Sequence, residues 1–441
     1  MQAHVRKLFS DIGETFWLLP AAMVVAGILL AVGLIDLDRS GIVPAWLIES
    51  PWLYNGGATG ARTLLGAVAS STIGVAGTVF SITIAALSLA AGQMGPRLLR
   101  NFTRDRGNQF TLGAFLATFS YALMVLRSVR TQSEGAFVPH ASLGVSILLA
   151  FLCVGTLVFF VGHMAGRINV DTVIELVSDD LRSAIQRLTF DQPQTQASTA
   201  DIWDGAMPIV DQRRGYLQQM QAEALAEWAA QQGTTLRLLA RPGDYVFPGA
   251  PIAEMTPPVE GAAAAIRAAT ALGPTRVSSA DLEFAIRQLV EVAVRALSPG
   301  INDPHTAMAV LDRLGAALCD IAPVHLASGI SLRRGRVVLV VPAVSYDGLA
   351  DGMFHMIRQN AANSTAVLLR ILEVLIAVTG CEQAPARVAT LRRHADLVLA
   401  DAEREVANQG DLADLRQRHA EFEATRQRRR PAATGDDLPS G

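Results

Sequence analysis

The chain has 441 residues, a formal net charge of −3 and an apolar fraction of 51%, with a mean hydropathy of +0.31. A near-neutral chain lacks the basic field that nucleic-acid binding requires, so we expect no nucleic-acid partner. Lys7 is the only lysine, which excludes a phosphate-binding Gly-Lys loop, a lysine Schiff base and a lipoyl or biotinyl carrier at any other position.

The first part of the chain contains four long apolar segments without Asp, Glu, Lys or Arg. They run over residues 16–35, 64–91, 110–126 and 141–164. Each is long enough to cross a hydrocarbon core of about 30 Å as a helix rising 1.5 Å per residue. The sequence therefore predicts a four-helix transmembrane domain over residues 1–167, with the lipid bilayer as its partner.

Basic residues predict the orientation of these spans. The N-terminus and the stretch 93–109 between the second and third spans are richest in arginine and lysine, with four arginines in that stretch alone. The positive-inside rule therefore places the N- and C-termini in the cytoplasm.

The second span carries small and hydroxyl residues on one helical face. Spacings of three, four and seven place these residues in a stripe, with Thr78 beside it: Ser70, Gly74, Gly77, Ser81 and Ser88. Two interpretations remain open. The stripe is either a packing seam inside the four-helix bundle or the lining of a conduit built by several subunits. The spans lack the acidic residues that ion-coupled pumps use, so a conduit would be passive.

Arginines flank the ends of the spans. Arg62, Arg127 and Arg130 lie on the predicted outer side, and Arg97 and Arg100 lie on the inner side. Arginine rings favour anions, which gives a weak preference for an anion conduit. The alternative is that these side chains anchor helix ends to lipid headgroups.

The rest of the chain is predicted to form a mixed α+β cytoplasmic domain. We expect a stalk helix and linker over 168–204, a small β-rich module with Pro-Gly hairpins over 205–260, a mostly helical region over 261–427 and a disordered tail over 428–441. Within the helical region, residues 336–342 predict a buried strand, and a long charged helix from about Pro385 to Gln427 is broken at Gly410. The fold class is thus an α-helical membrane protein with a C-terminal α+β domain.

One turn in this region gathers polar side chains. Asn302, Asp303 and His305 stand together between two predicted helices, where they are candidates to bind a small ion or ligand. The alternative is a capping turn, because Asp303 precedes Pro304 at the first helical position. We found no catalytic motif and no paired-cysteine metal motif, so we expect no enzymatic activity, metal or cofactor.

The whole chain resembles a bacterial family of predicted membrane proteins, the domain-of-unknown-function 2254 family. The resemblance rests on segments from both halves, including Thr78–Ala90, Gly95–Gly107, Arg241–Val246 and Arg295–Pro304. It implies a multi-pass protein of the bacterial inner membrane with a cytoplasmic domain, and it implies no activity.

From the residues we hypothesise an oligomeric passive ion channel, a homo-oligomer lined by the second span, with the cytoplasmic domain assembling or gating it. The alternative is a membrane-anchored cytoplasmic sensor or scaffold without transport.

Overall fold

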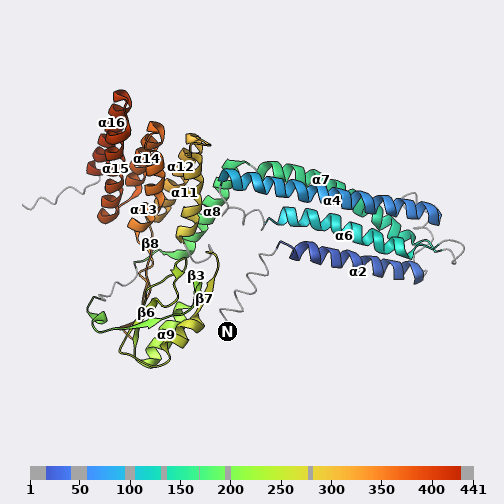
Figure 1. The fold of residues 1–441 in the computed structure, drawn as a ribbon, viewed down its shortest axis with the longest axis horizontal. Helices are drawn as coiled ribbons and strands as arrows, with labels where there is room; N and C mark the ends of the chain where they lie inside the picture. The colour runs from blue at the N-terminus through green and yellow to red at the C-terminus, as the bar shows by residue number, and fades with distance from the viewer. Residues whose placement is uncertain are drawn as a thin grey trace, which may run out of the picture. The chain divides into compact units, whose positions relative to one another are not determined.

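The computed structural model describes residues 16–40, 57–94, 105–130, 137–167, 169–193, 200–276 and 282–428. The chain divides into two compact units between Asn169 and Val170, and each has its own apolar core (Figure 1).

The N-terminal unit consists of long apolar helices. Its described helices are α2 (Leu18–Ser40), α4 (Ala58–Met94), α6 (Arg106–Ser128) and α7 (His140–Arg167). All four are long and apolar enough to cross a membrane. The prediction of four spans followed by a mixed α+β region is therefore confirmed, and we call this unit the membrane unit.

Helix α6 lies at the centre of the membrane unit, where it contacts α2, α4 and α7. In its most apolar stretch 56% of the residues are buried within the unit, against 22% in each of the other three helices. Since protein rather than lipid surrounds α6, it can hold polar side chains such as Thr111 and Thr118, which are buried. The other three helices turn most of their surface outward.

The C-terminal unit begins with α8 (Val170–Leu188) and combines a β part with a helical part. The β part has the strands β2 (Met207–Val210), β3 (Gly215–Met220), β4 (Thr235–Leu238), β5 (Tyr245–Val246), β6 (Pro251–Thr256), β7 (Thr270–Gly273), β9 (Ile330–Arg333) and β10 (Arg336–Val340). Two short helices, α9 (Ala222–Gln232) and α10 (Ala262–Ala269), accompany them. A separate pair joins β1 (Thr189–Phe190) to β8 (His325–Leu326).

The strands form a five-stranded sheet in the order β2-β6-β4-β10-β9 and a three-stranded sheet in the order β5-β3-β7. The pair β4–β10 is parallel, and the other pairs are antiparallel. Leu236 and Leu339, which are partners across β4–β10, are completely buried. The five-stranded sheet thus includes two strands from outside the 205–260 range, β9 and β10. The turn at Arg241–Asp244 carries the chain from one sheet to the other rather than closing a hairpin.

The helical part is a stack of helix pairs. Its helices are α11 (Leu282–Ala296), α12 (Pro304–Ile321), α13 (Tyr346–Asn360), α14 (Thr365–Cys381), α15 (Pro385–Glu405) and α16 (Gln409–Arg428). Within the stack α11 contacts α13 and α13 contacts α15, while α12 contacts α14 and α14 contacts α16. Helix α8 covers the α11/α12 end of the stack.

Local sequence explains where most of these helices begin and end. Asp303 caps α12 by accepting a hydrogen bond from the amide of Thr306, and Pro304 occupies the first turn. The sequence predicted one long helix broken at Gly410. The break instead falls at 406–408, where the side chain of Asn408 accepts from the amide of Gly410 at 2.8 Å and starts α16.

Candidate functional sites

The stripe on α4 faces away from the other helices of its own chain. The face of α4 that is buried in the unit is formed by Ala61, Leu65, Ala69, Thr72, Ala76, Val79 and Ala86. At 3.6 residues per turn, this face lies on the opposite side of the helix from the stripe. Ser70, Gly74, Gly77, Ser81 and Ser88 are all exposed, as is Thr78 beside them. A seam inside the single-chain bundle is therefore the wrong interpretation of the stripe.

The stripe leaves the helix backbone accessible at its glycines. The hydroxyl groups of Ser70 and Ser81 already have hydrogen-bond acceptors in their own helix. A Cβ atom added to Gly74 or Gly77 would meet no other described atom within 4 Å. The Ser70 hydroxyl donates to the carbonyl of Gly66 at 2.7 Å, and the Ser81 hydroxyl donates to that of Gly77 at 2.9 Å. Hydroxyls bonded to their own helix tolerate lipid, water or a second protein surface.

Three of the arginines that flank the spans, which we call the rim arginines, lie at one end of the membrane unit. Arg62 is exposed in the second turn of α4, Arg127 is exposed in the last turn of α6, and Arg130 follows it. Ala61 and Val129, their neighbours in sequence, belong to the same core cluster. Arg97 and Arg100 lie outside the described residues.

Two carboxylates of the membrane unit hold helix ends. Asp38 of α2 accepts from the amides of Ala141 and Ser142, each at 3.0 Å, and so caps α7. Asp105 caps α6 by accepting from the amide of Gly107 at 3.0 Å.

Asp105 also pairs with a histidine of α7. Its carboxylate lies 2.6 Å from Nε2 of His163, and both groups are largely removed from solvent. A Cβ atom on Gly107 would lie 2.7 Å from that same nitrogen, so glycine makes room for the imidazole. Nearby, the side-chain amide of Asn108 is buried and has no hydrogen-bond partner among the described residues. His163 thus joins α6 to α7 at the end of the membrane unit opposite Arg62, Arg127 and Arg130.

The predicted ligand residues at 302–305 form a capping turn. The Asp303 carboxylate accepts from both the amide and the hydroxyl of Thr306. Hydrogen bonds from Thr306, opposed by partial burial, hold the pKa of Asp303 below its usual value. Asn302 adopts a left-handed backbone conformation with φ of 50°, and the His305 side chain is exposed. The geometry accounts for Asp303 structurally, and an ion at this turn stays a prediction.

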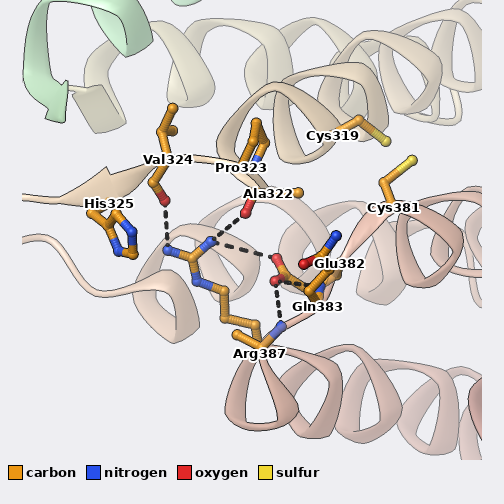
Figure 2. Close-up of a pocket in the computed structure, with 10 residues that line it drawn as sticks. Cys319, Ala322, Pro323, Val324, His325, Cys381, Glu382, Gln383 and Arg387 are labelled. Atoms are coloured by element: carbon orange, nitrogen blue, oxygen red, sulfur yellow. Dashed lines mark hydrogen bonds and ion pairs between the residues drawn. The ribbon is translucent and has the colours of Figure 1, made fainter. Parts of the chain in front are cut away.

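A pocket of about 790 Å³ opens at the ends of α12 and α14 (Figure 2). Arg387 of α15 donates to the carbonyls of Ile321 at 3.1 Å and Val324 at 3.0 Å, which closes the C-terminal end of α12. Glu382 accepts from the amide of Ala384 at 2.9 Å, next to the start of α15. The charged groups of the pocket therefore hold helix ends in place.

The pocket also brings two cysteines together. Cys319 of α12 and Cys381 at the end of α14 point toward one another in Figure 2, and both are free thiols. Burial and the neighbouring Cys381 raise the pKa of the Cys319 thiol to about 12. A protonated thiol is a weak nucleophile, so Cys319 is unsuited to nucleophilic catalysis at neutral pH.

Comparisons with known proteins agree with this architecture. The family model described as Predicted membrane protein (DUF2254) matches residues 13–377. The chain belongs to this family.

Curated relatives of this DUF2254 chain come from mycobacteria. An uncharacterized protein of Mycobacterium tuberculosis (strain H37Rv) is 30% identical over 409 residues, covering 90% of this chain and 78% of the relative. An uncharacterized protein of Mycobacterium bovis matches with the same identity and coverage. No solved structure matches the chain at a significant level.

The sequence of this DUF2254 chain did not reveal the side chains that connect one helix to another. Asp38 and Asp105 lie outside the apolar segments, and nothing in the sequence indicates which other helix each carboxylate contacts. A second group was also missed, although Asp351 and His355 are four residues apart on one helix face. With His394 of α15 they form a donor set that suits a metal ion, the one such group in the described part of the chain. The spacing of Asp351 and His355 was the available signal, and folding alone supplies the third residue.

Proposed function

We propose that this protein forms a homo-oligomer through the exposed face of α4 and that the oligomer is a passive ion conduit. The observation that carries the proposal is the stripe of small and hydroxyl residues on the side of α4 that its own bundle leaves uncovered. Small residues let helices approach closely, and hydroxyls can face water in a pore.

The arginines at the ends of the spans support a weak preference of the proposed conduit for anions over cations. Arg62, Arg127 and Arg130 are exposed at one end of the membrane unit, where arginines in several subunits would gather into a ring. We further propose that the protein lies in the bacterial inner membrane with both termini in the cytoplasm, as the distribution of arginine favours. The C-terminal unit would then assemble or gate the conduit without enzymatic activity.

The test is ion flux from liposomes that contain the purified full-length protein. Ser81→Leu places a large apolar side chain on the stripe. Ser71→Leu is the matched control, since Ser71 is also an exposed serine bonded to its own helix but lies about a quarter turn from the stripe. We expect flux in the wild type and in Ser71→Leu and its loss in Ser81→Leu, with chloride passing faster than potassium.

Oligomeric state is measured on the same samples by light scattering and cross-linking. Gly77→Leu should dissociate the oligomer, because a Cβ atom added at this position meets no described atom of its own chain within 4 Å, so we expect the larger side chain to disturb a neighbouring subunit. An intact wild-type oligomer without flux would favour the membrane-anchored sensor or scaffold. A monomeric wild type without flux would contradict the proposal altogether.

A further inference from the structure

Two helices of the C-terminal unit bring one carboxylate and two imidazoles together. Asp351 and His355 lie one turn apart on α13, and His394 reaches them from α15, which packs against α13. The Nε2 atom of His355 lies 3.0 Å from Oδ1 of Asp351, and the Nε2 atom of His394 lies 3.1 Å from the same oxygen. The three ligand atoms all lie within 4.8 Å of one another.

The side chain of His394 is buried, but the described residues around it do not satisfy the hydrogen-bonding capacity of its ring. Its side chain has 0% exposure, and neither ring nitrogen has a hydrogen-bond partner of good geometry among the described residues. The Nδ1 atom of His355 is likewise buried without a partner. Leaving a buried polar atom unsatisfied costs roughly 1–3 kcal/mol, and the His394 Nε2 atom, which lies 3.1 Å from Oδ1 of Asp351, is the unsatisfied atom that an ion held between the three side chains would bind.

The charges around the cluster fit a cation at Asp351. Although burial opposes ionisation, Arg393 and the two histidines hold the pKa of Asp351 below its usual value, so the group is a carboxylate at neutral pH. Burial, with Arg393 and His355, lowers the pKa of His394 to about 4, which leaves a neutral imidazole with a free lone pair. Neutral imidazole and carboxylate are the ligand forms that Zn²⁺ takes.

We propose that Asp351, His355 and His394 form a binding site for a divalent transition-metal ion such as Zn²⁺, which joins α13 to α15.

The observed distances are close to those that the ion needs. Ligand bonds of about 2.0–2.1 Å in a tetrahedron place neighbouring ligand atoms about 3.3 Å apart. The two separations from Asp351 are 3.0 and 3.1 Å, so each histidine needs to move relative to Asp351 by only a few tenths of an ångström, and the ligand atoms of the two histidines lie within 4.8 Å of one another. Three protein ligands leave the fourth position to water.

Arg393 is a competitor for the same carboxylate. Its Nη2 atom lies 2.6 Å from Oδ1 of Asp351, and its side chain is 43% exposed. The guanidinium can therefore turn into solvent or bond the second carboxylate oxygen when a metal ion arrives. The exposed sides of Asp351 and His355 give the ion its way in. Both Nδ1 atoms lack a supporting acceptor among the described residues, so we expect an exchangeable ion rather than a tightly held one.

The test uses the full-length protein in detergent, without an affinity tag, stripped with a chelator and then dialysed. Titration with Zn²⁺ against a chelating dye gives stoichiometry and affinity, and Co²⁺ gives a visible absorption band that reports tetrahedral coordination. We expect one ion per chain. His355→Gln and Asp351→Asn, at partly exposed positions, should each weaken binding by more than the roughly 10- to 100-fold that is lost when a side chain hydrogen-bonded to a metal ligand is removed.

Two controls separate a metal site from a hydrogen-bonded ion pair. His419→Gln breaks a comparable pair between His419 and Asp396, at 2.8 Å, which forms no three-residue donor set among the described residues, so it should leave Zn²⁺ affinity unchanged. Arg393→Gln removes the competing cation and should tighten binding. Arg393→Gln binding more weakly, or His419→Gln weakening Zn²⁺ as much as His355→Gln, would overturn the proposal as adventitious binding.

A measurement on the wild type keeps the proposal testable if the variants fold poorly. Zn²⁺ should protect His355 from modification by diethylpyrocarbonate, as read by mass spectrometry of the α13 peptide, while leaving the exposed His305 reactive. Equal reactivity of His355 with and without Zn²⁺ would refute the site.

Discussion

Substituting Gly27 should push helix α2 away from helix α6 in the membrane unit. Gly27 of α2 is buried against α6, and an added Cβ atom would lie 2.8 Å from the carbonyl oxygen of Ala117 and 3.3 Å from its Cα. The atoms that it meets are backbone and cannot rotate away, so α2 must move outward by roughly half an ångström to restore a normal contact. Gly33 lies on the same helix with no described atom within 4 Å of an added Cβ, which makes Gly33→Ala the matched control.

The difference between the two variants isolates packing. Each replacement gains about 1 kcal/mol of helix propensity, because alanine is the better helix former. Gly27→Ala additionally forces an extra methyl group into a packed interface, which typically costs 1–3 kcal/mol. We therefore expect Gly27→Ala to be about 1–3 kcal/mol less stable than Gly33→Ala, and Gly27→Val to be less stable again.

The assay is thermal unfolding of the full-length protein in detergent, combined with hydrogen exchange of peptides from α2 and α6. Faster exchange confined to these two helices is expected in Gly27→Ala. Equal stability of the two alanine variants, with unchanged exchange, would refute the close approach of α2 to α6 on which the reasoning rests.

Three further outcomes follow from buried or capping groups. Asp401→Asn removes the charge that pairs with buried Arg358, so the free energy of unfolding of the C-terminal unit should fall by about 3–5 kcal/mol. Denaturation followed by circular dichroism measures this change, and a loss below about 1 kcal/mol would contradict the prediction. Asp38→Ala removes the cap of α7 and should cost about 0.5–2 kcal/mol, whereas Asp36→Ala at an exposed position should cost nothing measurable, and equal effects would count against the cap. Partial burial and Cys381 raise the pKa of the Cys319 thiol to about 12, so Cys319 should react with iodoacetamide far more slowly at pH 8 than the same cysteine in urea. A fast reaction of the folded protein at pH 8 would show that the pKa of this thiol is not raised.

The parts of the fold that sequence predicted well are those that local chemistry determines. An apolar segment without charges must avoid water, so composition alone located the four helices of the membrane unit. Asp303 followed by Pro304 located the start of α12 to the residue, because an acceptor and a fixed φ act within one turn. The same local argument chose Gly410 as the break before α16, and Asn408 caps that helix instead.

The parts that sequence did not predict depend on contacts between distant segments. The strand β10 was expected as a strand, but its parallel pairing with β4 joins residues about a hundred positions apart, and periodicity carries no information about partners. His394 reaches Asp351 only because successive helix pairs stack, so the three-residue donor set exists in the fold and not in any sequence window. Asp105 and His163 meet for a similar reason, since α6 and α7 pack side by side.

The outward orientation of the stripe on α4 bears on whether the stripe contacts lipid or a second copy of the chain. In a seam within one chain, close packing would offset the cost of Gly74 and Gly77, but in this fold they face outward, and no described atom lies within 4 Å of a Cβ added at either position. Each glycine costs about 1 kcal/mol of helix propensity relative to alanine, and a surface that meets only lipid gives nothing in return. In the proposed homo-oligomer a second copy of α4 would offset this cost, because the same face on each subunit would offer the close approach that glycine permits. An anchor that merely holds the C-terminal unit at the membrane would instead accept leucine at position 77 with no change in assembly, and the Gly77→Leu variant distinguishes these two roles.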